Sequence, residues 1–212
     1  MISIIKNLSK TAIAVIAVSI AFTSCTKDNS DSSKPLTATN QSATVTGITT
    51  TLLTGNYGSP TPAPGVYGTK YLNIATGAQD STGTITYHLT FTSTNNLAIA
   101  PKAGAGYTFK YLNTTKSLAT VNNADYTAAT AVAAGSTLNL NTLTDSLNTG
   151  LGANGWLNYN STTHVVNYTH NVVLFIRVGT ITYAFQCYAA AGQGSATLNR
   201  GRYWFRRGTL IN

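Results

Sequence analysis

The chain has 212 residues, of which only 8% are charged, and its formal net charge is +8. All five acidic residues are Asp, so no Glu is available for a paired-carboxylate hydrolase, which makes an enzyme of that class unexpected. The polarity comes instead from Thr, Asn, Ser and Gly, which suit strands and turns better than helices. We therefore expect a mainly β fold.

Residues 1–24 form a targeting segment. Lys6 and Lys10 are basic, and residues 11–22 make an apolar run of signal-peptide length, which is shorter than a membrane-spanning helix requires. Cys25 then follows two small residues, which resembles a bacterial lipobox. The resemblance implies cleavage before Cys25 and lipidation of this residue. An ordinary signal peptide is the alternative. After lipidation only Cys187 is a free thiol, which excludes an intramolecular disulfide.

The next residues, 25–44, are polar and have little to bury, so they read as a flexible tether. Lys27 and Asp28 resemble the short charged signals that send some lipoproteins to the surface of Gram-negative cells. We expect a lipid anchor in the outer membrane, at the cell surface. Residues 45–212 are enough chain for one domain with a sizeable core.

Within this domain the pattern of β-branched and aromatic residues predicts a series of strands. We expect an antiparallel, two-sheet, sandwich-like arrangement with at most one or two short helices. Leu138, Leu143 and Leu147 approach helical spacing, so one short helix is predicted over residues 138–147. The predicted strands are residues 45–53, 66–74, 83–92, 107–111, 155–159, 172–178, 181–189 and 202–210.

The central feature is the hairpin formed by residues 172–178 and 181–189 around Gly179. Its first strand is almost wholly apolar, as in a strand buried on both faces. In its second strand, side chains point alternately to the two faces, which places Cys187 with Phe185 on the core face. Cys187 is therefore predicted to be an inert core thiol rather than a nucleophile.

Four arginines cluster near the end of the chain, at positions 200, 202, 206 and 207. In a strand, Arg202, Trp204 and Arg206 share one face. Arginines alternating with aromatic residues suit an anionic, planar ligand. The alternative is a terminal strand with solvated arginines lying over aromatic rings. Because the other basic residues are scattered and the lipobox places the protein outside the cytoplasm, no nucleic-acid partner is expected.

The three histidines differ in context. His88 falls in a predicted strand, on the face of Thr90 and opposite Tyr87, and reads as an ordinary strand histidine. His164 lies where a predicted turn meets the next segment, and His170 ends that segment. In a straight strand these two would project from one face about 20 Å apart, so they do not clamp one iron unless the chain turns between them.

Several stretches resemble the HmuY-like lipoproteins. They are residues 155–166, 173–179, 183–186 with Tyr188, and 202–206, with a fainter likeness at 87–91. In this order they present a Trp-aromatic turn with a Thr-His step, an apolar strand ending in Arg, a Gly-containing hairpin, a Tyr-containing strand and a closing aromatic-Arg strand.

The resemblance implies an all-β domain that captures haem or a related porphyrin at the bacterial surface and passes it to an outer-membrane transporter. It also implies His164 as the ligand of the haem iron. The family's second ligand falls in residues 126–135, which contain neither His nor Met, so the iron is expected to be five-coordinate or weakly completed by Tyr126, His170 or water. Arg202 and Arg206 suit the propionates.

Two other functions stay open. One is a non-catalytic surface lipoprotein on the same scaffold that binds a glycan, a peptide or a protein partner through exposed aromatic residues. The other is an enzyme, which the lack of acid–base pairs and of known catalytic motifs disfavours.

Overall fold

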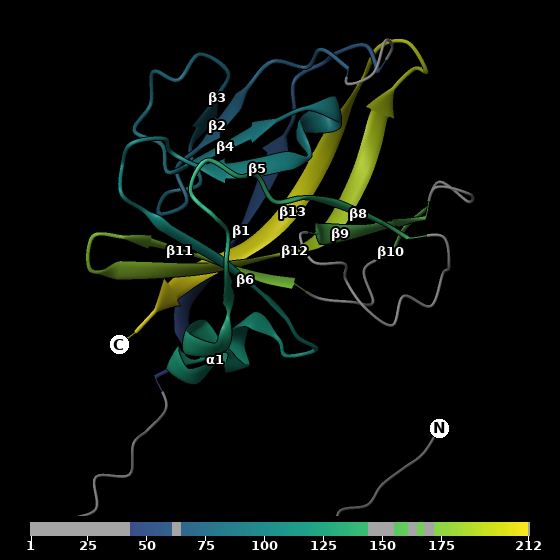
Figure 1. Cartoon of the computed structure of the whole chain (residues 1–212). Helices are drawn as coiled ribbons and strands as arrows, with labels where there is room; N and C mark the ends of the chain where they lie inside the picture. Colours follow the sequence, from purple (N-terminus) through teal and green to yellow (C-terminus); the bar gives the residue numbers. More distant parts are fainter. Residues whose placement is uncertain (1–42, 61–64, 144–154, 161–164, 168–171, 212) are drawn as a thin grey trace, which may run out of the picture. The chain divides into compact units, whose positions relative to one another are not determined.

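The computed structural model describes residues 43–60, 65–143, 155–160, 165–167 and 172–211 (Figure 1). A six-stranded antiparallel sheet contains, in spatial order, β1 (Val45–Thr54), β13 (Asn199–Leu210), β12 (Ile181–Gly194), β11 (Val172–Val178), β6 (Thr108–Asn113) and β7 (Thr130–Ala131). A four-stranded antiparallel sheet contains β3 (Gln79–Asp80), β2 (Lys70–Leu72), β4 (Leu89–Thr92) and β5 (Ala98–Pro101). The expected mainly β class with two antiparallel sheets is confirmed.

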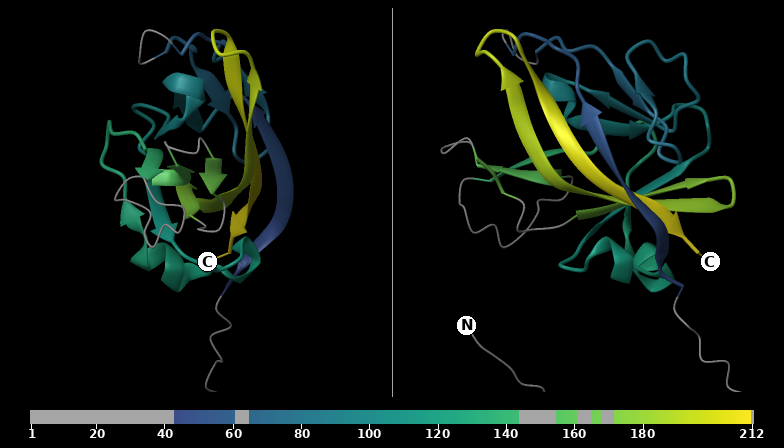
Figure 2. Two further views of the ribbon diagram at one scale, coloured as in Figure 1. Left: turned by 90° about the vertical axis from the view of Figure 1, so that its right-hand side faces the viewer. Right: turned by 180° about the vertical axis from the view of Figure 1, so that it is seen from behind.

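A third sheet has three strands, β10 (Val165–Asn167), β9 (Gly155–Asn160) and β8 (Asn139–Leu143). Its β8–β9 pair is parallel, unlike every pair in the two larger sheets. The left view of Figure 2 shows the long strands β1 and β13 curving along one side, with α1 (Asn123–Ala128) near one end. Two short 3-10 turns, η1 (Thr94–Asn96) and η2 (Leu118–Thr120), complete the described elements.

The predicted central hairpin is confirmed. Strands β11 and β12 pair from Val178–Ile181 to Leu174–Phe185, and Gly179 supplies the positive φ of 61° that the two-residue turn requires. Strand β12 continues beyond the predicted end, to Gly194. The chain thus builds its largest sheet around a local hairpin.

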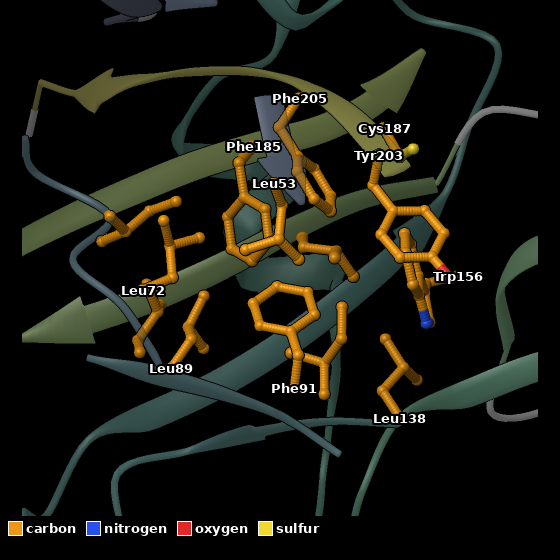
Figure 3. Packing of buried hydrophobic residues seen from close by; sticks show 14 of the residues in the cluster. Leu53, Leu72, Leu89, Phe91, Leu138, Trp156, Phe185, Cys187, Tyr203 and Phe205 are labelled. Carbon is orange, nitrogen blue, oxygen red and sulfur yellow. The ribbon is translucent and has the colours of Figure 1, made fainter. Parts of the chain in front are cut away.

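The apolar character of β11 follows from burial on both of its faces. Leu174 and Ile176 face the main core, which lies between the six-stranded and four-stranded sheets. Val173 and Phe175 face a second, smaller cluster that includes Leu118 and the edge of α1. Figure 3 shows the main core, in which side chains from both large sheets interdigitate. A strand with two buried faces needs apolar residues at consecutive positions.

The predicted helix over residues 138–147 is wrong for its first part. Asn139–Leu143 is strand β8, and Leu138 forms a bridge with Ile99. Residues 144–147 lie outside the described residues. Asn and Thr are weak helix formers, so the backbone of this segment pairs with β9 and Leu138 bridges to Ile99 instead of forming a short helix.

The one α-helix among the described residues lies elsewhere, in α1. Asn122 caps it by accepting hydrogen bonds from the backbone N–H groups of Ala124 and Asp125, while the Asp125 carboxylate accepts one from the N–H of Asn122. This reciprocal capping box fixes where the helix starts. The spacing of Asn122 and Asp125 was the sequence signal for this helix, and no helix was predicted there.

Two predicted strands are shorter than expected. In the segment 83–92 only Leu89–Thr92 forms a strand, because the backbone N–H groups of Gly83, Thr84 and Ile85 bond to the carboxylate of Asp80 instead. In the segment 66–74 only Lys70–Leu72 forms a strand, after Gly68 at a φ of 66°, and Val66 makes an isolated bridge to Ser59.

The predicted facing of His88 is also wrong. A bend immediately before β4 breaks the alternation of side chains between the two faces. His88 is therefore buried, while Tyr87 and Thr90 both line a surface groove that is described below.

The described residues all belong to one compact unit. The signal segment, Cys25 and the tether up to residue 42 lie outside the described residues, so their assignment stays a prediction. The last residue of the predicted tether, Thr44, is described and bridges to Asn122. No helix in the described part is long and apolar enough to span a membrane.

Candidate functional site

Trp156, on which the sequence resemblance centres, is an anchor of the core. Its indole is only 3% exposed and its Nε1 donates a hydrogen bond to the carbonyl of Leu97 at 2.7 Å. The ring stacks on Phe205 with centroids 5.5 Å apart and meets Tyr203 edge-on at 5.1 Å. Figure 3 shows Trp156 beside Tyr203. The indole therefore holds β9 against the sheet and has no free face for a ligand.

The turn between Trp156 and the expected iron ligand is only partly described. Both His164 and His170 lie outside the described residues, although β9 and β10 on either side of the turn pair from Asn160–Val165 onward. The role of His164 therefore stays a prediction. No group of three or more His, Cys, Asp or Glu side chains that could hold a metal ion occurs in the residues that the structure describes.

Tyr126, which the resemblance offers as a substitute ligand, lies in α1 and packs on the smaller cluster. Its ring meets Phe175 edge-on at 5.5 Å. Two cations approach the ring, Lys110 Nζ at 4.5 Å and the Arg177 guanidinium at 4.8 Å. Phe175 and Trp156 belong to clusters on opposite faces of the six-stranded sheet. The structure therefore separates Tyr126 from Trp156 by the thickness of this sheet.

Arg202 and Arg206 leave β13 on the face away from the main core, as the alternation predicts. The Arg202 guanidinium lies 5.0 Å from the ring centre of Trp204, and that of Arg206 lies 4.8 Å from that of Tyr188. Tyr203 and Phe205 occupy the opposite, buried face. Arg206 is exposed and Arg202 is half-buried, and both lie on the outer face of β13, whereas Tyr126 lies over β11 and β6.

The described carboxylates, Asp80 and Asp125, form hydrogen bonds that stabilise local structure. Burial alone would raise the pKa of Asp80, but hydrogen bonds from the Thr84 hydroxyl and from the backbone of Gly83, Thr84 and Ile85 lower it to about 2. Asp125 caps α1 and pairs with Lys116 at 2.6 Å. Neither carboxylate is therefore placed as a general acid or base.

Cys187 and His88 are both buried. Burial raises the pKa of the Cys187 thiol, whose Sγ contacts the carbonyl of Ala189 at 3.3 Å. This agrees with a core thiol. The His88 ring lies between Tyr107 and Tyr183, at 5.7 and 6.0 Å, and its Nδ1 has no hydrogen-bond partner. Burial, followed by the charge of Lys102, lowers the pKa of His88, so the ring is neutral at pH 7.

The structure also contains a hollow that the sequence did not indicate, here called the tyrosine groove. It has a volume of about 710 Å³ and lies over the face of the four-stranded sheet that points away from the core. Its main lining residues are Tyr71, Tyr87, Thr90, Thr92, Lys102 and Tyr107. Alternation in β4 predicts that Thr90 and Thr92 share a face, but only the pairing of β2 with β4 brings Tyr71 beside Thr90.

No family model, curated protein or solved structure matches this chain.

Proposed function

We propose that this chain is a non-catalytic, lipid-anchored protein of the bacterial surface, of the HmuY-like type. It captures haem or a related porphyrin and hands it to an outer-membrane transporter. In this proposal His164 ligates the iron as the cargo binds. The iron is five-coordinate, or weakly completed by His170 or water, because Tyr126 lies across the six-stranded sheet from Trp156.

One observation carries the proposal: the stretches that resemble the family converge on one core. Trp156 from β9, Phe185 from β12 and Phe205 from β13 belong to it, and the Phe205 ring contacts the other two at 5.5 and 5.7 Å. Residues far apart in the chain thus combine into a single packing unit. This common core supports the inference that the chain has the scaffold of the HmuY-like proteins. In that scaffold the ligand-binding turn follows the position of Trp156.

The state of the reactive groups supports a binding role over catalysis. Asp80 and Asp125 are used for a turn and a helix cap, and the Cys187 thiol is buried with a raised pKa. An enzyme needs a nucleophile or an acid–base pair that reaches its substrate. These groups are instead used for folding.

The test is a titration of haem into the processed protein, followed by its Soret absorbance. The wild type is expected to shift the band, and His164→Ala is expected to abolish the shift. His88→Gln is the matched control, because His88 is 7% exposed and packed between two tyrosines. An unshifted band in the wild type would refute haem capture. A shift that survives His164→Ala would keep the function and discard this ligand.

Capture of a different ligand on the same scaffold is the second candidate function. The tyrosine groove favours it, because Tyr126, Arg202 and Arg206 are not among the residues that line this hollow.

A further inference from the structure

The tyrosine groove has the size and form of a small-ligand site. Its volume of about 710 Å³ falls within the range of about 300–1,000 Å³ that is typical of ligand pockets. The floor is the sheet face formed by β2, β4 and β5, where Tyr71 pairs with Thr90 and Thr90 with Ala100. Because this floor is a hydrogen-bonded sheet, its side chains are held in a fixed array.

Aromatic rings form the apolar part of the lining. The ring centroids of Tyr71 and Tyr87 are 4.7 Å apart and the ring planes are inclined by 62°, so the two ring faces point in different directions. Tyr71, Tyr87 and Tyr107 are all half-buried. A tyrosine in such a position offers an apolar ring together with a hydroxyl that can donate and accept hydrogen bonds.

Hydroxyl groups form the polar part. Thr90 and Thr92 from the floor and Ser136 from the rim add to the three phenol groups. A wholly apolar ligand would cover these hydroxyls and offer them no hydrogen bond, which disfavours its binding, although the Thr90 hydroxyl also donates to the carbonyl of Ala100 at 3.4 Å. A peptide strand normally adds to a sheet edge through its backbone, and this groove lies on a sheet face.

The rim is open and carries one charge. Gly104 and Gly106 line the groove, and a Cβ atom built on either would meet no atom within 4 Å, so bare backbone borders the hollow there. Lys102 Nζ lies 4.8 Å from the ring centre of Tyr87. None of the described lining residues is acidic, so this ammonium group gives the groove a positive charge.

We propose that the tyrosine groove binds an oligosaccharide, with Lys102 selecting a sugar that carries a carboxylate. A pyranose ring has an apolar C–H face for the tyrosines and hydroxyls at its edge for Thr90, Thr92 and Ser136. A uronic acid adds the anion that complements Lys102. This proposal does not rest on the haem proposal, because Tyr126, Arg202 and Arg206 are not among the described residues that line the tyrosine groove.

Isothermal titration calorimetry on the processed full chain tests this site. The probes are a trisaccharide of galacturonic acid and the corresponding galactose trisaccharide, which differ only at C6. The acidic probe is expected to bind more tightly. Tyr87→Ala should weaken both probes about three- to tenfold, since an aromatic contact is lost. Lys102→Gln should weaken only the acidic probe, by about two- to fivefold.

Two variants serve as matched controls. Tyr87→Phe keeps the ring and should retain most of the affinity. Tyr57→Ala removes an equally large ring that is 45% exposed and lies outside the groove, against Arg200, and should leave the affinity unchanged. Circular dichroism and melting curves check that each variant is folded.

If neither probe binds to the folded wild type, the proposal is overturned. Equal losses in Tyr87→Ala and Tyr57→Ala also overturn it, because the contact would then not lie in the groove. An equal effect of Lys102→Gln on both probes overturns the selection of acidic sugars.

Discussion

Replacing Phe185 by Ala tests whether the central hairpin is the core of this fold. Phe185 is completely buried, stacks on Phe109 with centroids 6.4 Å apart and meets Phe205 edge-on at 5.7 Å. Emptying an aromatic core site costs about 3–5 kcal/mol of unfolding free energy. Each lost ring pair contributes about 0.5–1.5 kcal/mol beyond burial, which favours the upper part of that range.

Urea denaturation followed by tryptophan fluorescence measures the loss, because Trp156 is in the same cluster. With a slope of about 2 kcal/mol per molar urea, the midpoint should fall by about 2 M. Ile181→Ala in the same strand is the control, since Ile181 is 45% exposed and its loss should cost about 0.5 kcal/mol or less. A cost below about 1 kcal/mol for Phe185→Ala would refute the reasoning.

Four further outcomes are expected. Phe175→Ala should also cost about 3–5 kcal/mol in the same assay, because its fully buried ring loses Tyr126; a cost like that of Ile181→Ala would contradict this. Arg207→Met should lower the melting temperature more than Arg206→Met, because Arg207 donates hydrogen bonds to Thr51 Oγ1 and to the carbonyls of Ile74, Ala75 and Thr76; equal effects would argue against this staple. Asp80 has its pKa lowered from 3.8 to about 2, so its stabilising contribution is complete above the higher value and lost as the pH falls through the lower one. Asp80→Asn should remove that part of the acid dependence of stability, and an unchanged acid profile would count against it. Cys25→Ala should release the protein from the membrane fraction or leave it unprocessed, whereas wild-type protein that is soluble with residues 6–22 intact would exclude lipidation.

Only those features of the candidate site that follow from the alternation of side chains along one strand could be predicted from the sequence. The alternation in residues 202–206 correctly separates Arg202 and Arg206 from Tyr203 and Phe205. It does not show that the arginines lie over Trp204 and Tyr188 or that Tyr126 is across the sheet from Trp156. Those relations depend on which strands pair and on which face α1 covers.

The sequence by itself determined the mainly β class, the central hairpin and the double burial of β11, because each follows from periodicity or turn chemistry within about ten residues. Only the tertiary structure decided that Asn139–Leu143 is a strand, since its partner β9 begins 12 or more residues further along the chain. The tyrosine groove likewise exists only because β2 pairs with β4 and sets Tyr71 beside Thr90. Contacts between distant segments depend on the free energy of the whole packed domain, so a pattern within a few neighbouring residues does not predict them.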